Sequence, residues 1–196
     1  PMFHASRTYA SVTKQAEHII VPEQVPAAMR RAFSQLKNGR PGPVVIALPE
    51  DTLTERIAVS DATRFEPVDT SPGQSEMSLL QDLLRRAKHP VVLIGGSRWS
   101  EQASASLMRF AERFALPVAT TFRRGHLVDA MHPCYAGDFG IGPNPKLLAR
   151  VKGADLVLLI GARLNWLLSH GKGRSWGDAR KTFVQIDIEP REMDSN

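Results

Sequence analysis

The sequence predicts an α/β fold: a doubly wound, mainly parallel sheet with helices on both faces, of the Rossmann-like type. Short apolar runs typical of buried strands recur through the second half of the chain, at Val91–Ile94, Val118–Thr121, Leu156–Ile160 and Phe183–Ile188. Segments with the apolar spacing of helices precede or separate these runs, and glycine or proline marks many of the boundaries. Because parallel neighbours need a crossover, this alternation indicates βαβ units with helices on both sides of one sheet.

The composition of the 196-residue chain is that of a globular protein, with 42% hydrophobic and 23% charged residues. The sequence contains no apolar run long enough to predict a membrane-spanning helix. A single cysteine, Cys134, excludes an internal disulfide framework and a cysteine-based zinc cage. Since the first residues also lack the apolar core of a signal peptide, we expect a cytoplasmic, reducing location.

The charge balance is mildly basic, with 25 Lys and Arg residues against 20 Asp and Glu residues. The basic residues are scattered, without interleaved aromatic residues or a recognisable nucleic-acid-binding motif. We therefore expect a solvated surface rather than a nucleic-acid groove, with a few basic residues suited to phosphorylated cofactors.

The first 50 residues contain one helix-like and one strand-like segment. Apolar side chains with helical spacing come after Pro22-Glu23, at Val25, Met29, Phe33 and Leu36. Asn38-Gly39 ends this helix, and a turn rich in glycine and proline leads into a strand at Val44–Leu48, expected to be buried. Because one helix and one strand cannot form an independent core, residues 1–50 are predicted to belong to another domain or to pack on the later part of the chain.

Residues 51–74 are predicted to be a linker, and residues 75–196 to form the sheet domain. Ser75 is expected to cap a helix that runs through Leu84, with Ser78 as an alternative boundary. Ser100 or Glu101 is expected to open a second helix. A short third helix is expected at Lys146–Val151. The chain begins at Pro1 and stops after an acidic, strand-like segment, and we expect it to be part of a longer protein.

Three strand ends carry residues suited to a nucleotide, because ligands of doubly wound sheets gather at the carboxyl ends of the strands. Gly95-Gly96 permits close approach of the backbone to a phosphate, with Arg98 as a charge partner. Arg163 comes after a Gly-Ala turn at the end of another strand. Asp187, near the end of the last strand, suits a ribose diol.

Each feature also has a purely structural interpretation. The G-x-G-x-x-G fingerprint is absent, so Gly95-Gly96 also suits an ordinary tight turn. Asp187 also suits a cap or an ion pair. No catalytic or metal-binding set is predicted, because His132-Pro133-Cys134 lacks a second ligand pair at metal spacing. The basic segment between Trp166 and Trp176 is either a solvated loop or an anion clamp.

Several segments resemble thiamine-diphosphate-dependent decarboxylases, lyases and acetolactate synthases. The string GRPGPVVIALPED at residues 39–51 resembles the end of the pyrimidine-binding domain of that family. Residues 90–96 resemble the start of its central domain, and Gly161–Leu164 and Gln185–Ile188 resemble two of its strand-end motifs. The resemblance implies that residues 1–50 are a C-terminal remnant of the pyrimidine-binding domain, and that residues 75–196 are a Rossmann-like central domain.

Two branches of the family compete. Residues 119–124 and 138–145 resemble acetolactate-synthase-like proteins. The string RLNWLLSHGKG at residues 163–173, with Trp176-Gly177 and residues 192–196, resembles oxalyl-CoA decarboxylase. The 2-hydroxyacyl-CoA lyases share the first four residues of that string. The second match is the more diagnostic, because its R-L-N-W string is rarer than generic strand-end motifs. A relative with features of both branches also fits.

The resemblance implies an adenine nucleotide in the central domain, either ADP, as in oxalyl-CoA decarboxylase, or FAD, as in acetolactate synthase. Arg163 would contact the phosphates or the ribose, and Asp187 with Ile188 the adenosine end. Gly96 stands where the decarboxylase pattern has lysine, and Arg98 is the candidate to replace that charge.

The family's chemistry needs thiamine diphosphate, magnesium, a glutamate in the pyrimidine-binding domain and a Gly-Asp-Gly…Asn stretch. No Gly-Asp-Gly occurs in this sequence, so we expect the chain to be inactive alone and not to bind thiamine diphosphate by itself. The parent enzyme, a homo-oligomer containing the remaining domains, would act on a 2-keto acid or an acyl-CoA. The alternative is a stand-alone adenine-nucleotide-binding regulatory module without catalysis.

Overall fold

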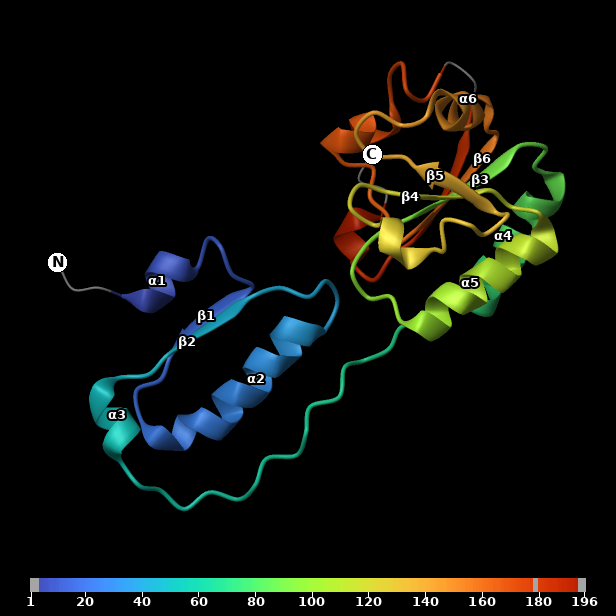
Figure 1. The fold of residues 1–196 in the computed structure, drawn as a ribbon. Helices are drawn as coiled ribbons and strands as arrows, with labels where there is room; N and C mark the ends of the chain where they lie inside the picture. The colour runs from blue at the N-terminus through green and yellow to red at the C-terminus, as the bar shows by residue number, and fades with distance from the viewer. Residues whose placement is uncertain (1–3, 178–179, 194–196) are drawn as a thin grey trace. The chain divides into compact units, whose positions relative to one another are not determined.

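A computed structural model of the chain describes residues 4–177 and 180–193 (Figure 1). The chain divides into two compact units, Pro1–Thr70 and Ser71–Asn196, and the division falls within the segment expected to be a linker. Residues 194–196, part of the segment that resembles oxalyl-CoA decarboxylase, lie outside the described residues.

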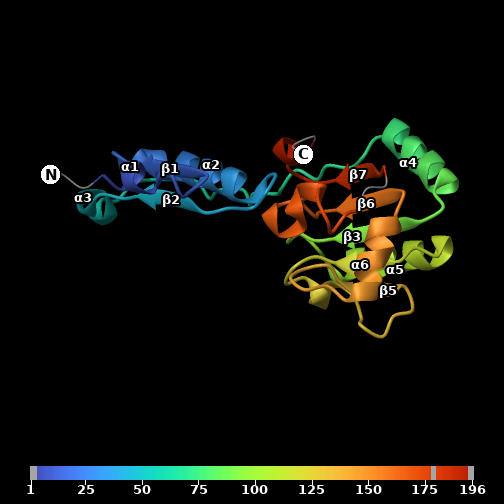
Figure 2. The same ribbon diagram turned by 90° about the horizontal axis from the view of Figure 1, so that it is seen from above.

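The second unit is built on a five-stranded parallel sheet (Figures 1 and 2). Its strands are β3 (Pro90–Ile94), β4 (Val118–Thr120), β5 (Tyr135–Asp138), β6 (Leu156–Ile160) and β7 (Thr182–Ile186). Their order in the sheet is β5-β4-β3-β6-β7, and every neighbouring pair is parallel. The chain thus moves outward from β3 through β4 and β5, then returns to the other side of β3 with β6 and β7. This topology confirms the predicted doubly wound α/β fold.

Three helices longer than two turns cover the sheet: α4 (Gln74–Arg86), α5 (Glu101–Phe114) and α6 (Pro145–Gly153). Alternate side chains of β3 enter two different cores because successive residues of a strand face opposite sides. Val91 and Leu93 join the core that contains Leu147 and Val151 of α6. Val92 and Ile94 join the core that contains residues of α4 and α5. Helices therefore lie on both faces of the sheet, as predicted.

The strand expectations at Val91–Ile94, Val118–Thr121, Leu156–Ile160 and Phe183–Ile188 are confirmed to within two residues at each end. The edge strand β5 was not predicted, because Gly137 and Asp138 interrupt the apolar pattern and the strand is only partly buried. Its pairing with β4 carries a register shift between Val118 and Ala119. Short 3-10 turns η2 (Gly125–Leu127), η3 (Trp166–Gly171) and η4 (Pro190–Glu192) complete the loops.

The two predicted serine caps have different outcomes. The hydroxyl of Ser100 accepts the backbone N–H of Ala103 at 3.1 Å and caps α5, as expected. The cap predicted at Ser75 is wrong, since α4 begins one residue earlier with Gly73 at its N-cap. The Ser75 hydroxyl instead donates to the carboxylate of Glu76 at 2.8 Å.

The first unit contains a two-stranded parallel sheet. Its elements are α1 (Ala5–Tyr9), β1 (Gln15–His18), η1 (Pro22–Gln24), α2 (Val25–Lys37), β2 (Val44–Ala47) and α3 (Glu50–Thr54). The helix predicted after Pro22 is confirmed, whereas α1, β1 and α3 were not predicted. The strand predicted at Val44–Leu48 is confirmed over Val44–Ala47, but the expectation that it is buried is wrong, because its side chains are only partly buried and Leu48 is 42% exposed. Residues 55–73, after α3, have no regular secondary structure.

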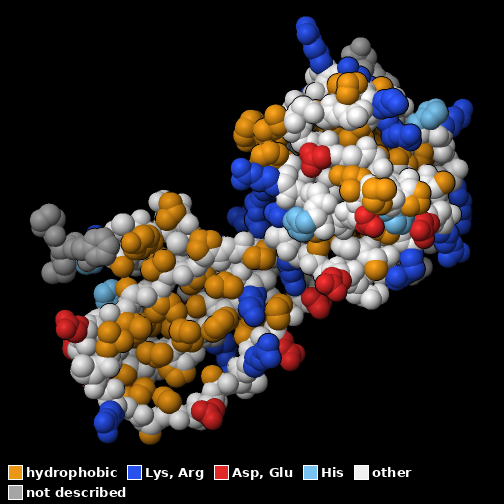
Figure 3. All heavy atoms as spheres, viewed as in Figure 1, with side chains coloured by type: hydrophobic (Ala, Val, Ile, Leu, Met, Phe, Trp, Pro, Cys, Tyr) orange, Lys and Arg blue, Asp and Glu red, His pale blue; other side chains and the backbone are white. Residues whose placement is uncertain are grey.

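One face of the first unit exposes large apolar side chains. Met29, Phe33 and Leu36, which lie on α2 at helical spacing, are 37–42% exposed. Figure 3 shows apolar side chains gathered over the side of this unit that carries α2. Within the described residues, no helix is both long and apolar enough to cross a lipid bilayer.

The two loops at the switch point, where the chain changes direction between β3 and β6, are in direct backbone contact. Gly96 has a φ of +79°, and a Cβ on this residue would lie 2.7 Å from the carbonyl oxygen of Gly161. Gly161 has a φ of +62°, and a Cβ there would lie 2.8 Å from the carbonyl oxygen of Gly95. Both glycines are therefore required for packing as well as for backbone conformation.

We predict that Gly96→Ala lowers the free energy of unfolding by about 1–3 kcal/mol, because it adds a left-handed alanine and a clash with backbone atoms. Urea denaturation measures this loss. Gly125→Ala is the matched control, since no atom of the described residues lies within 4 Å of its added Cβ, and it should change stability by less than about 0.5 kcal/mol. Equal stability of the two variants would contradict the packing argument.

Asp155, just before β6, fastens the start of β3. Its two carboxylate oxygens accept the backbone N–H groups of Lys88 at 2.7 Å and His89 at 3.0 Å. Burial acts to raise the pKa of Asp155, but these hydrogen bonds outweigh it and hold the pKa below its ordinary value. The carboxylate therefore stabilises the fold above pH 4, roughly its pKa in an unfolded chain, and this contribution is lost as the pH falls through the lower folded-state pKa.

We predict that Asp155→Asn destabilises the protein by about 1 kcal/mol at pH 7, because one amide oxygen cannot replace two carboxylate acceptors. The difference from the wild-type chain should shrink as the pH falls below about 4. Urea unfolding at a series of pH values measures both effects. Asp82→Asn, which removes only an exposed partner of Arg85, should have an effect of a few tenths of a kcal/mol. A pH-independent difference for Asp155→Asn would argue against the carboxylate's role.

Candidate functional site

The carboxyl ends of the five parallel strands lie at one edge of the sheet, where the loops after β3, β6 and β7 bring together the residues singled out from the sequence. Gly95 is buried and Gly96 is exposed, both directly after β3. The carbonyl oxygen of Gly95 accepts the indole N–H of Trp99 at 2.5 Å. Arg98 is exposed in the same loop. The glycine pair thus forms a tight turn against the neighbouring loop, which is the structural interpretation of this motif.

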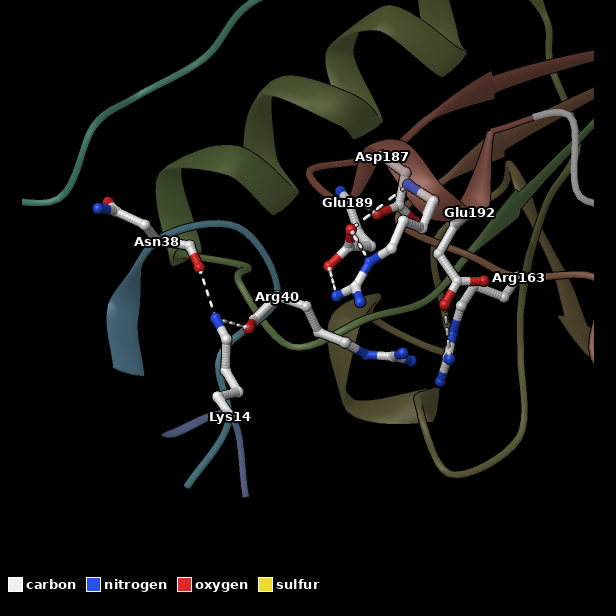
Figure 4. A network of polar contacts seen from close by, with 8 residues as sticks. Lys14, Asn38, Arg40, Arg163, Asp187, Glu189 and Glu192 are labelled. Carbon is white, nitrogen blue, oxygen red and sulfur yellow. Dashed lines mark hydrogen bonds and ion pairs between the residues drawn. The ribbon is translucent and has the colours of Figure 1, made fainter. Parts of the chain in front are cut away.

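Arg163 lies two residues beyond the switch-point glycine of the β6 loop. Its guanidinium Nη1 is 3.0 Å from Oε1 of Glu192, a residue of η4 (Figure 4). The Arg163 side chain is 41% exposed and the Glu192 side chain 22% exposed. The positive charge predicted for this edge is therefore present, and it is paired with a carboxylate of the same unit.

The segment after β7 forms a compact acidic turn. One carboxylate oxygen of Asp187 accepts the backbone N–H of Glu189 at 2.9 Å and so holds the turn before η4, whose N-cap is Glu189. Ile188 is partly buried between them. The buried carboxylate of Glu189 accepts from Nε and Nη2 of Arg191 at 2.9 and 3.0 Å. The hydrogen bond to Glu189 raises the pKa of Arg191.

The roles of Arg191 and Glu192 were not predicted from the sequence. The signal that would have found them is the string Glu189-Pro190-Arg191-Glu192, in which proline opens a helical turn and charges alternate around it. Arg163 and Arg191 each meet a glutamate from this string. An incoming anion must therefore compete with Glu192 for Arg163.

The loop after β6 contains the basic segment between Trp166 and Trp176, which the sequence left open as a solvated loop or an anion clamp. This loop is anchored to the core. Asn165 caps η3 by accepting the backbone N–H of Leu167 at 3.1 Å. Trp176 is buried, donates its indole N–H to the carbonyl oxygen of Leu168 at 2.7 Å, and packs edge-on against Phe139. Trp166, in contrast, is 73% exposed. The loop is thus anchored by Asn165 at its start and by Trp176 at its end, while the side chain of Trp166 is exposed to solvent.

Two consecutive residues of this loop, Ser169 and His170, adopt left-handed backbone conformations with φ of +49°. Such conformations are costly for residues other than glycine and persist only where the surroundings enforce them. The anchoring by Asn165 and Trp176 supplies that constraint.

In the first unit, the turn at residues 39–43 is fastened by Lys14 (Figure 4). The ammonium group of Lys14 donates to the carbonyl oxygens of Asn38 and Arg40, each at 2.9 Å. The backbone N–H of Lys14 also donates to the carbonyl oxygen of Pro43 at 2.8 Å. Lys14 was not singled out from the sequence, because nothing in its local pattern relates it to a turn more than 20 residues away.

Histidine and carboxylate groups elsewhere in the described residues do not gather into a metal site, since no group of three or more metal-ligating side chains lies together there. His132, the first residue of the His132-Pro133-Cys134 string, contacts Glu112 through Nε2 at 3.1 Å. Its Nδ1 lies 3.2 Å from the backbone nitrogen of Cys134, which donates to it. These contacts attach the loop before β5 to helix α5.

Comparison with known proteins identifies the family. Residues 77–196 match the family model described as "Thiamine pyrophosphate enzyme, central domain". Oxalyl-CoA decarboxylase of Escherichia coli (strain K12) is 32% identical over 199 residues, which cover 98% of this chain and 33% of that protein. A probable acetolactate synthase large subunit of Methanocaldococcus jannaschii is 29% identical over 201 residues, covering 96% of this chain and 33% of that protein.

A solved structure agrees with these matches. The benzoylformate decarboxylase from Polynucleobacter necessarius superposes with a TM-score of 0.75 at 25% identity, covering 91% of this chain and 33% of that protein. This chain spans about a third of the length of the curated relatives it matches. The parallel sheet, its strand order and the matched segment agree: the chain belongs to the thiamine pyrophosphate enzyme central-domain family and is related to decarboxylases of that family.

Proposed function

We propose that this chain supplies the central domain, and the C-terminal part of the pyrimidine-binding domain, of a thiamine-diphosphate-dependent decarboxylase or lyase. The observation that carries the proposal is the family match over residues 77–196, on a sheet with the doubly wound order. The assignment of residues 1–50 to the pyrimidine-binding domain rests on the resemblance of residues 39–51, and the alignment of a relative with 98% of this chain supports a place for the first unit in the same enzyme.

The proposed substrate is a 2-keto acid or an acyl-CoA. The names of two relatives support these classes, since one is an oxalyl-CoA decarboxylase and the other a benzoylformate decarboxylase. Benzoylformate is a 2-keto acid, and both substrates carry a carbonyl carbon next to the carboxylate that is lost. The string at residues 163–173 favours the acyl-CoA class.

The described residues of this chain do not fit thiamine diphosphate and magnesium. The described residues hold no cluster able to bind a metal ion, and the sequence has no Gly-Asp-Gly. When bound, thiamine diphosphate supplies the carbanion that attacks a substrate carbonyl. We propose that it binds, with magnesium, to parts of a longer enzyme outside these residues.

The remaining domains of that enzyme are the proposed partners of the first unit. A two-stranded sheet with one principal helix buries little apolar surface, and the described residues of that unit leave Met29, Phe33 and Leu36 of α2 exposed as an apolar face. The homo-oligomeric parent enzyme would bury such a face between domains.

We further propose an adenine-nucleotide cleft, for ADP or FAD, at the carboxyl edge of the second unit. The doubly wound topology supports this position, because the crevice outside the switch point of such sheets is where nucleotides bind. Gly95 and Gly96 would bring backbone near the phosphates, with Arg98 and Arg163 as charge partners. Asp187 and Ile188 would face the adenosine end, and Asp187 keeps one carboxylate oxygen beyond the one that caps the turn.

The coding sequence on either side of these 196 codons tests the parent enzyme. We predict a Gly-Asp-Gly…Asn stretch within about 100–200 residues after Asn196, that interval being one domain length. Sequencing the flanking DNA is the measurement. Stop codons directly after residue 196, together with a start codon directly before residue 1, would contradict the proposal and favour a stand-alone regulatory module.

Calorimetric titration with ADP, FAD and coenzyme A tests the nucleotide cleft. We predict that ADP or FAD binds and that Arg163→Ala weakens binding at least about tenfold, because a charge-assisted phosphate contact is lost. Glu192→Gln should tighten binding, since it releases Arg163 from its carboxylate partner. Arg109→Ala, on the exposed side of α5, is the control and should leave the affinity unchanged. Absence of heat with both ADP and FAD, or full affinity in Arg163→Ala, would overturn this cleft.

A further inference from the structure

A second concave site lies in the second unit, at the end of the sheet opposite to the proposed nucleotide cleft. It has a volume of about 380 Å³ and opens beside the amino ends of β4 and β5 and one side of α6. Leu116 and Pro117 precede β4, Pro133 precedes β5, and Leu147 belongs to α6; these residues form apolar walls. We call this cavity the α6 pocket.

Two cationic side chains line the α6 pocket. Lys146 and Arg150 are four residues apart on α6, so their side chains lie on the same side of the helix. Among the described residues that line the pocket, none is acidic. In the part of the chain that the structure describes, neither cationic side chain takes part in an ion pair or a side-chain hydrogen bond. The pocket therefore combines apolar walls with an uncompensated positive charge.

The position of Lys146 and Arg150 on the helix makes their positive charges more unfavourable. Lys146 stands in the first turn of α6, near the positive end of the helix dipole, and no acidic residue occupies that turn. Two like charges at this spacing also repel each other. An anion bound between Lys146 and Arg150 would relieve both unfavourable interactions.

We propose that the α6 pocket binds a small organic anion that carries a carboxylate on an apolar body. The guanidinium of Arg150 is suited to pair with a carboxylate through two parallel hydrogen bonds, and Lys146 adds a point charge beside it. The proline and leucine side chains would cover the apolar body. The volume is at the lower end of the range for small-molecule sites, and it suits a ligand of the size of phenylacetate.

This site is independent of the proposed thiamine-diphosphate chemistry and of the nucleotide cleft. Its lining comes from the segments that lead into β4 and β5, from the start of β5 and from α6, whereas the nucleotide residues lie at or after the carboxyl ends of β3, β6 and β7. A ligand here would contact α6 and the loops before β4 and β5, and would act on the domain from the side opposite to the cleft.

Titration of the ¹⁵N-labelled 196-residue chain with phenylacetate tests the proposal. We expect saturable amide shifts at Leu116, Cys134, Tyr135 and Leu147. Phenylacetamide, which has the same shape without the charge, and acetate, which has the charge without the apolar body, should each bind at least about tenfold more weakly. A tenfold loss corresponds to about 1.4 kcal/mol. No saturable shift at millimolar phenylacetate, or equal binding of phenylacetamide, would overturn the proposal.

Charge variants assign the binding to the two cations. The double variant Lys146→Gln/Arg150→Gln should bind phenylacetate at least about tenfold more weakly. Lys146→Glu should also lose binding, and it places an acid in the first helical turn, where it favours α6, so loss of fold would not account for that result. Lys152→Gln, on the same helix and outside the pocket lining, is the matched control and should bind normally. Unchanged binding in the double variant would overturn the assignment.

Cys134, the one cysteine of the sequence, provides an independent reporter because it lines the same pocket. The anionic reagent 5,5′-dithiobis(2-nitrobenzoate) should modify it faster in the wild-type chain than in the double variant. The neutral reagent 4,4′-dithiodipyridine should show no such difference. Phenylacetate should slow both reactions in the wild-type chain, and a lack of protection at saturating phenylacetate would contradict binding in the α6 pocket.

Discussion

Strand β3 is the element on which the second unit depends, because it is covered on both faces and paired along both edges. It is hydrogen-bonded to β4 on one side and to β6 on the other. Its four apolar residues, Val91–Ile94, are fully buried and divide alternately between the two cores. Because both cores and both halves of the sheet meet at this strand, its ends determine where the chain turns. The close contact of Gly96 with Gly161 results from that position.

At the carboxyl edge of the sheet, oppositely charged side chains form ion pairs. Arginine side chains there meet glutamates from the segment of η4, and Asp187 is used in part to hold the turn that positions them. This pairing neutralises charge at the edge, and a nucleotide in the proposed cleft would have to displace Glu192 from Arg163. The α6 pocket has the opposite character, since the described residues that line it include two cations and no carboxylate. The charges at the carboxyl edge are thus paired, whereas the cations that line the α6 pocket are not paired within the described residues.

Local sequence patterns were sufficient to predict the elements whose polar and apolar residues match their exposure in the fold. Helix α5 has a serine cap and a regular apolar face, and the inner strands β3 and β6 are continuous apolar runs. The strands that were not predicted are extended because they pair with a neighbouring strand, and not because of their own residue pattern. β5 carries Gly137 and Asp138 and is extended because it pairs with β4. β1 is half-polar and is extended because it pairs with β2. Gln15 of β1 lies opposite Val44 of β2, 29 residues later in the sequence.

The sequence by itself determined the fold class, the resemblance to the family and the three strand ends with nucleotide-like residues, because each rests on local pattern and residue type. Only the tertiary structure decided how those residues are used. Arg163 meets a glutamate 29 residues away, the glycines after β3 meet the glycine after β6, and Lys14 meets the turn after α2. The α6 pocket likewise exists only where three separate segments meet. Such contacts depend on the order of strands in the sheet, and no local pattern in the sequence encodes that order.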